Sequence, residues 1–193
     1  MRVLVVFAHP SPISFNASLH AQVLEALRQK GHEVDDCDLY AEGFNPVLSQ
    51  EEHLIYGEVP ANRAGVAGYV DRLLAADALV LIYPVWNEGF PAIFKGFLDR
   101  VFLPGVCFVK DRGVPKPALL NIKKIATVCT YGAGRLPTMV LGDPPRKVVK
   151  RLLRAMTARN ARCDYLALYN MDRVSSDKRA RFRRRVGRLF EVW

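Results

Sequence analysis

Five short segments of the chain carry the apolar, β-branched residues that are typical of strands. The clearest are residues 2–8 (RVLVVFA), 77–84 (DALVLIYP) and 123–131 (KKIATVCTY), which are nearly continuous apolar runs. Runs of this kind are typical of strands that are covered on both faces. Residues 32–40 (HEVDDCDLY) and 163–171 (CDYLALYNM) predict two further strands, and the more polar 32–40 is expected near an edge of the sheet.

Between these segments, apolar residues return with the spacing of helices. A helix is predicted from Asn16 to a stop at Gly31, and another over residues 91–102, where apolar positions at i, i+3, i+4, i+7 and i+8 form a wide face. Further helices are predicted at residues 66–75 and 145–160 and from Ser175 or Ser176 towards Trp193. Residues 41–64 are irregular, with one short helix expected near 50–56.

Strands that alternate with helices predict a single α/β domain over residues 1–193. Each parallel crossover needs a helix to return the chain, so we expect a doubly wound, five-stranded parallel sheet with helices on both faces. Five strands in this arrangement favour the order 2-1-3-4-5, which reverses between the first and third strands. Ligands bind at such a reversal, outside the carboxyl ends of the strands.

Composition and charge narrow the classes of function. The apolar N-terminal run is too short for a signal peptide or a membrane span, and the four cysteines form no CxxC pair. We therefore expect free thiols in the cytoplasm, with neither a metal site nor a redox pair. The formal charge is +9, and the basic residues gather between Arg146 and Arg188. Because they alternate with apolar positions at helical spacing, they favour the solvated faces of two helices over a nucleic-acid site.

The turn after the first strand reads HPSPISFN (residues 9–16) and offers the hydroxyls of Ser11 and Ser14 and the amide of Asn16. Together with the free N–H groups of the following helix, these groups can hold a phosphate. The turn lacks the GxGxxG pattern of dinucleotide sites, whereas a flavin phosphate held by hydroxyl groups is compatible with it. The alternative is that Ser14 or Asn16 only caps the helix.

The turns after the third and fourth strands are expected at the same edge of the sheet. PVWNEGFP (residues 84–91) presents Trp86 and Asn87 before Gly89, a surface on which a flat heterocycle can rest, unless Trp86 fills the core. TYGAG (residues 130–134) can present consecutive backbone N–H groups to the electron-rich edge of a ring, or it is simply a tight turn. The three turns together predict one site for a ligand with a phosphate and a flat ring.

Three stretches of the sequence carry a resemblance to a known family. They are AHPSPISFNASL (residues 8–19), DLYAEGFNPVLS (38–49) and, most specifically, YPVWNEGFPAIFKGFLDRVF (83–102). Over most of residues 2–135 the chain resembles the NAD(P)H:quinone oxidoreductase family of flavodoxin-like proteins. This family includes bacterial relatives described as modulators of drug activity or as ancillary subunits of potassium efflux systems.

The resemblance implies a flavodoxin-like fold and a tightly bound FAD or FMN. It also implies two-electron reduction of quinones or similar flat acceptors by NADH or NADPH in a ping-pong cycle, usually in a homodimer. The alternative is a regulatory flavoprotein that contacts a membrane transporter, with secondary redox activity. Carried over by position, the flavin-binding residues are His9, Ser11, Ser14, Phe15 and Asn16 on the phosphate side, Pro84, Val85, Trp86, Asn87 and Gly89 along the ring, and Thr130, Tyr131 and Gly132 at its pyrimidine end.

The chain departs from the family pattern after its fourth strand. Animal members place a Tyr and a His there to stabilise the reduced flavin, whereas residues 130–147 hold no His and only one Tyr, Tyr131, which precedes the glycines. No catalytic residue is therefore assigned, and Arg135 or the N–H groups of Gly132 and Gly134 are candidates for that role. Tyr131 and Trp86 are the aromatic residues expected closest to the ring. The helix of residues 91–102 and the following LPGVCF (residues 103–108) are the candidates for a dimer contact.

Overall fold

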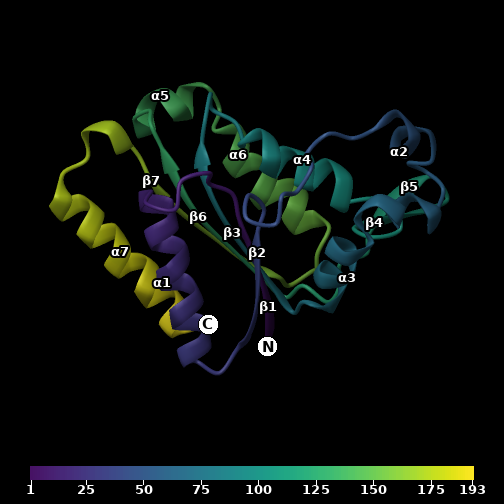
Figure 1. Cartoon of the computed structure of the whole chain (residues 1–193), viewed down its shortest axis with the longest axis horizontal. Coiled ribbons are helices and arrows are strands. Elements are labelled where there is room, and N and C mark those ends of the chain that lie inside the picture. The colour runs from purple at the N-terminus through teal and green to yellow at the C-terminus, as the bar shows by residue number, and fades with distance from the viewer.

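The structure, a computed structural model that describes residues 1–193, is built on a parallel sheet of five strands (Figure 1). The strands run in the order β2 (Glu33–Asp38), β1 (Arg2–Phe7), β3 (Ala78–Val85), β6 (Lys124–Tyr131) and β7 (Arg162–Leu168). All four pairings between neighbours are parallel. The predicted order 2-1-3-4-5 is confirmed, with the polar strand β2 at one edge.

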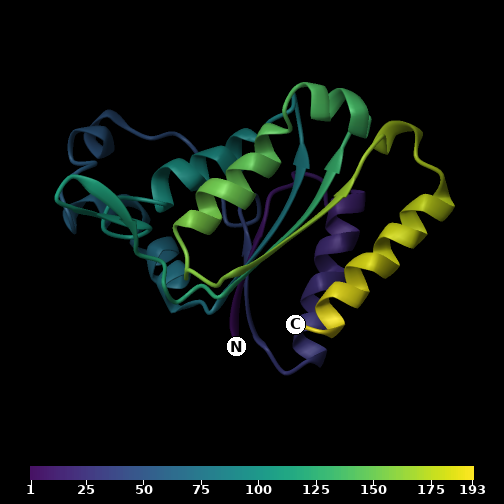
Figure 2. The ribbon, with the colours of Figure 1, turned by 180° about the vertical axis from the view of Figure 1, so that it is seen from behind.

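Helices cover both faces of this sheet, as Figures 1 and 2 show from opposite sides. One face carries α1 (Phe15–Gln29) and α7 (Ser176–Glu191), and their apolar residues form one core with alternate residues of β1, β3 and β6. The other face carries α3 (Ala67–Ala75), α4 (Ala92–Val101) and α6 (Pro144–Lys147), which continues into wider helical turns at Val148–Leu153. Each face of the sheet therefore has its own core, which explains the continuous apolar runs of the central strands.

The ends of α1 and α7 follow from local sequence. Ser14 caps α1 by accepting a hydrogen bond from the Ala17 N–H at 3.0 Å, and Gly31, at φ +73°, lies just after the helix ends. Ser175 caps α7 in the same way. The arginines on α7 are mostly exposed, whereas its apolar residues face α1 and the sheet. The basic segment therefore forms a solvated helix face, as its spacing predicts.

Several elements differ from the sequence-based expectations. The hairpin of β4 (Phe108–Asp111) and β5 (Val114–Pro117) and the short α5 (Arg135–Val140) are not anticipated by the pattern. The helix expected at 145–160 ends near residue 155, because the following Thr157 pairs with Leu119 at the edge of the domain. In contrast, α2 (Gln50–Leu54) lies where expected, with a capping box formed by Ser49 and Glu52.

The apolar face of α4 is used entirely inside the chain. Phe94, Phe97 and Val101 are fully buried, and Leu103 and Cys107 in the segment that follows are almost as inaccessible. The apolar side chains of residues 91–108 that are named here therefore belong to the core, and a dimer contact by this segment stays a prediction. None of the helices is both long enough and apolar enough to cross a membrane.

Candidate functional site

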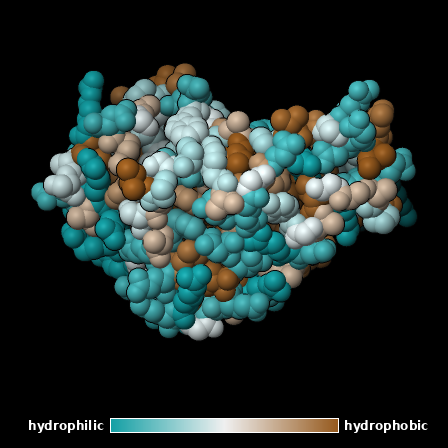
Figure 3. Space-filling view, viewed as in Figure 1, coloured by the Kyte–Doolittle hydropathy of each residue, from teal (hydrophilic) through white to brown (hydrophobic).

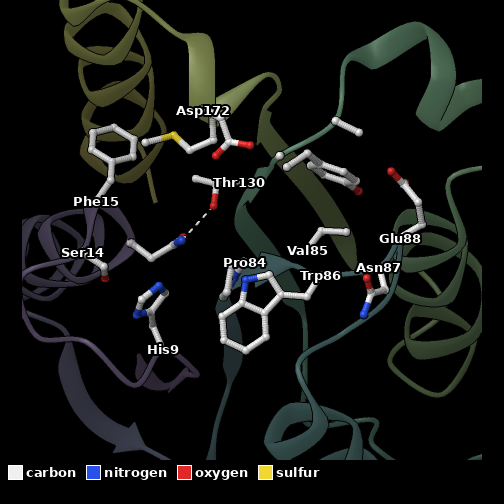
Figure 4. A pocket seen from close by; sticks show the side chains of 15 residues that line it. His9, Ser14, Phe15, Pro84, Val85, Trp86, Asn87, Glu88, Thr130 and Asp172 are labelled. Atoms are coloured by element: carbon white, nitrogen blue, oxygen red, sulfur yellow. Dashed lines mark hydrogen bonds between the residues drawn. The ribbon is translucent and has the colours of Figure 1, made fainter.

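A pocket of about 670 Å³ lies at the carboxyl ends of the central strands (Figure 4). Its volume falls within the range of about 300–1,000 Å³ that is typical of small-molecule sites. The three predicted turns meet in it, after β1, β3 and β6. The predicted residues that line it are His9, Ser14, Phe15, Asn16, Pro84, Val85, Trp86, Asn87, Thr130, Tyr131 and Gly132.

Two predicted residues, Ser11 and Gly89, do not line the pocket but shape its turns. The Ser11 N–H donates a hydrogen bond to Nδ1 of His9 at 3.0 Å. Gly89 closes the second turn, because its N–H and C=O both pair with Trp86. The resemblance implies that both bind the cofactor, and the structure places them in the turns beside the pocket.

The first turn presents hydrogen-bond donors at one end of the pocket. The N–H groups of Phe15 and Asn16, in the first turn of α1, have no carbonyl partner four residues earlier within the helix. Burial lowers the pKa of His9, and the N–H of Ser11 occupies its Nδ1. His9 is therefore held as a neutral ring that can donate through Nε2. A helix N-terminus with these donors fits an anionic group such as a phosphate.

A buried hydrogen bond joins the first turn to the third. Nδ2 of Asn16 donates to Oγ1 of Thr130 at 2.8 Å, and both residues are at most 4% exposed (Figure 4). Oδ1 of Asn16 is buried and has no hydrogen-bond partner. Asn16 thus ties the first turn of α1 to the end of β6, while Ser14 provides the cap of α1.

The second turn presents an indole to the mouth of the pocket. Trp86 is 42% exposed, so it does not fill the core beneath the loop. Its ring meets that of His9 edge to face, with centroids 6.0 Å apart. Pro84 and Val85 precede it in the same pocket wall. Pro84, Val85 and Trp86 give this wall the apolar character that suits a heterocycle.

The hydroxyl of Tyr131 in the third turn is hydrogen-bonded within the chain. Its hydroxyl donates to Oδ1 of Asp143 at 2.7 Å and lies 2.7 Å from the hydroxyl of Tyr165. Burial raises the pKa of Tyr131, so the hydroxyl stays protonated. The Tyr131 side chain therefore fixes the third turn to Asp143 and Tyr165. Arg135, a candidate for stabilising the reduced flavin, is exposed and lines a separate depression beside α5, not this pocket.

Sequence reasoning missed four lining residues: Glu88, Ala133, Met171 and Asp172. Glu88 and Ala133 each lie within or beside a turn that was anticipated. Met171 and Asp172 belong to a fourth segment, after β7, and Oδ2 of Asp172 would lie 3.4 Å from a Cβ on Gly132. The rule that places ligands at the carboxyl ends of strands could have included this segment, because β7 ends at the same edge.

The pocket fits the flavin that the resemblance implies. Donors of the first turn and the apolar wall with Trp86 line the same pocket, and they meet where the rings of His9 and Trp86 are in contact. The lining contains neither Lys nor Arg, so a phosphate here depends on neutral donors: N–H groups, the Ser14 hydroxyl and the His9 ring. Glu88 and Asp172 are the carboxylates of the lining.

Comparisons with known proteins place this chain in a family. A family model for the flavodoxin-like fold matches residues 1–138. The chain is 35% identical over 136 residues to an uncharacterized NAD(P)H oxidoreductase of Haemophilus influenzae, covering 69% of this chain and 65% of that protein. It is 32% identical over 162 residues to NAD(P)H dehydrogenase [quinone] 1 of Rattus norvegicus, covering 74% of this chain and 58% of the rat protein.

A solved structure matches along nearly the whole chain. It is the NAD(P)H:quinone oxidoreductase from Methanothermobacter marburgensis, with a TM-score of 0.84 and 27% identity, covering 99% of this chain and 98% of that one. The matches to the Haemophilus and rat proteins, by contrast, span less than two thirds of those proteins' lengths. The match of the family model over residues 1–138 shows that this chain belongs to the flavodoxin-like family that contains the NAD(P)H:quinone oxidoreductases.

Proposed function

We propose that this protein is a flavin-dependent NAD(P)H oxidoreductase that reduces quinones or similar flat acceptors by two electrons. The observation that carries the proposal is one pocket whose lining combines neutral phosphate donors with an apolar wall. A bound FMN or FAD would supply the redox chemistry, which is hydride transfer from the nicotinamide to the acceptor by way of the flavin.

In this proposal each turn of the chain has a distinct task. Ser14, His9 and the first N–H groups of α1 bind the phosphate of the cofactor. Asn16 and Thr130 hold the first and third turns at a fixed separation, so that the two ends of the pocket keep their spacing. The N–H groups of the third turn, which the bond from Tyr131 to Asp143 holds in place, would bind the pyrimidine end of the ring.

Donor and acceptor use the same slot in turn. Residues 84–87 would hold the ring, and the partly exposed Trp86 would border the slot that both substrates use. The protein's contribution is orientation and exclusion of water, because hydride transfer requires the reacting atoms to be about 3–3.5 Å apart. One slot for two substrates implies a ping-pong cycle. No side chain is needed as a nucleophile.

The proposal includes a homodimer and a cytoplasmic location. The apolar surface that supports a dimer is on α5, where Leu136, Met139, Val140 and Leu141 are each more than half exposed beside the pocket. Figure 3 shows hydrophobic side chains at the upper edge, over α5, whereas the lower part over α1 and α7 is mainly hydrophilic. The four cysteines are all free thiols, which fits a reducing compartment.

Steady-state kinetics test the proposed function. The purified protein is mixed with NADH or NADPH and with a neutral quinone such as 2-methyl-1,4-naphthoquinone, and both concentrations are varied. We expect quinone-dependent oxidation of the nicotinamide, with parallel lines in double-reciprocal plots. Mass spectrometry of the cofactor released by heat distinguishes FMN from FAD. A flavin-loaded protein that does not turn over with either nicotinamide contradicts the proposal.

A further inference from the structure

The turn that carries Glu88 has an unusual backbone for its sequence. Trp86 and Gly89 pair through both backbone hydrogen bonds, at 3.1 and 2.9 Å. The two residues between them, Asn87 and Glu88, have φ values of +49° and +53°. A turn with two such residues favours Asn followed by Gly, because Asn tolerates the left-handed region and Gly has no side chain to clash. Glu88 has neither advantage.

A strained residue in a pocket wall indicates that its side chain has a use there. One carboxylate oxygen of Glu88 accepts a hydrogen bond at 3.2 Å from Oγ1 of Thr138, which is fully buried in α5. The other oxygen, Oε2, is buried and has no hydrogen-bond partner. A buried carboxylate oxygen without a donor is unfavourable, so the chain alone leaves Glu88 incompletely satisfied. A ligand with an N–H or O–H group would supply the missing donor.

No basic residue balances this carboxylate within the pocket. The lining contains neither Lys nor Arg, although the chain as a whole has a formal charge of +9. Glu88 lies across the pocket from Ser14, next to Asn87 and Trp86 (Figure 4). In the proposed function this is the end where the ring and the substrates lie. Asp172, the other carboxylate of the lining, lies nearer to Phe15 than Glu88 does (Figure 4).

We propose that Glu88 determines specificity: it admits neutral acceptors that carry an N–H or O–H donor and disfavours anionic ones. This inference rests on the proposed function and names the substrate class of the same slot. A carboxylate without a nearby cation repels a negative charge in a pocket of low dielectric constant. A ligand with an N–H or O–H group binds more tightly, because it donates the hydrogen bond that Oε2 of Glu88 lacks.

Two flat ligands of nearly equal shape test the inference by binding alone. 2-Naphthamide is neutral and carries an N–H donor, whereas 2-naphthoate is anionic and carries none. Their dissociation constants are measured by calorimetry with the protein as purified. We expect the wild type to bind the amide at least about tenfold more tightly, which corresponds to about 1.4 kcal/mol. In Glu88→Gln we expect the ratio to fall close to one.

Two further variants make the result decisive. Glu88→Gly removes the carboxylate and also restores the residue that the turn favours, so it should lose the selectivity while unfolding at a higher urea concentration. Glu58→Gln alters an exposed glutamate on the segment between α2 and α3 and should keep the wild-type ratio. A ratio near one in the wild type, or an unchanged ratio in both Glu88 variants, overturns the inference.

Turnover separates this inference from the proposed function. 2-Methyl-1,4-naphthoquinone is neutral and carries no donor, and 1,2-naphthoquinone-4-sulfonate is anionic, so this pair tests the charge part of the inference. Glu88→Gln should improve kcat/KM for the sulfonate about tenfold relative to the neutral quinone. If Glu88→Gln turns over with the same preference between the two quinones as the wild type, only the role of Glu88 is contradicted. Absence of turnover in the wild type contradicts the proposed function, whatever the binding ratio.

Discussion

Replacement of Gly96 by alanine tests how the long irregular segment is attached to the domain. Gly96 lies on α4, where residues 41–64 pass over the helix. A Cβ at this position would lie 2.3 Å from the carbonyl oxygen of Pro46 and 2.4 Å from its Cα. Four residues later, Arg100 contacts the same segment through Glu52 and the carbonyl of Asn45. Gly96 therefore allows the two backbones to touch beside an ion pair.

Two opposing effects determine the size of the change. Alanine is favoured over glycine in a helix by about 1 kcal/mol. Overpacking costs about 1–3 kcal/mol, and the upper end applies here because the clash is with backbone and not with a flexible side chain. Gly96→Ala should therefore lower the free energy of unfolding by about 2 kcal/mol. The displacement of Pro46 should also loosen the contacts of Arg100.

Urea denaturation followed by circular dichroism measures the effect. Gly68 provides the matched control, because it lies in α3, is exposed, and would have no atom within 4 Å of an added Cβ. Gly68→Ala should raise the free energy of unfolding by up to about 1 kcal/mol. If Gly96→Ala is as stable as the wild type, or more stable, the close approach of Pro46 to α4 is refuted.

Three further changes probe the site and its support. Tyr131→Phe removes a donor to Asp143 and should lower the free energy of unfolding in urea by about 1–3 kcal/mol; no change would mean that Asp143 finds another donor. Asn16→Leu should weaken FMN binding to the apoprotein at least about tenfold in a calorimetric titration, and an equal affinity would exclude a role for the bond to Thr130. Arg100 lowers the pKa of Glu52 below its ordinary value of 4.5, so this pair stabilises the fold above that pH and the gain is lost as the pH falls through the lowered pKa. In Glu52→Gln the loss of stability in acid should be smaller than in the wild type, and an identical pH profile would contradict the pairing.

The sheet was predictable because each of its central strands is apolar on both sides. Residues such as Val80 and Ile82 face one core and Leu79 and Leu81 face the other, so the strand reads as one continuous run. Together with the intervening helices, this pattern is compatible with few topologies. The length of β3, eight residues, also favours a strand, because buried helices are usually longer than apolar runs of this length.

The unpredicted elements lack such a pattern. The β4–β5 hairpin is almost entirely exposed, and its turn depends on Arg112 and Gly113, both with positive φ. The six residues of α5 bury only Thr138, so they show no apolar period. Their conformation is decided by tertiary contacts, which sequence periodicity does not report.

The functional site, like the fold, was predictable in part. Its location follows from topology, and most of its lining lies in turns that the motifs identify. The role of Tyr131 could not be read from its position, because its partners Asp143 and Tyr165 come from distant parts of the chain. The importance of Glu88 depends on its left-handed backbone and its unpartnered oxygen, and neither is visible in the sequence.

The absorption spectrum of the purified protein tests the central claim most directly, together with a titration of the stripped protein with FMN and with FAD. The pocket formed by the turns after β1, β3 and β6 is expected to hold a flavin, so the protein should be yellow, with bands near those of bound flavins. The apoprotein should recover one flavin per chain at micromolar concentration or below. A folded protein that is colourless and binds neither flavin would contradict the account.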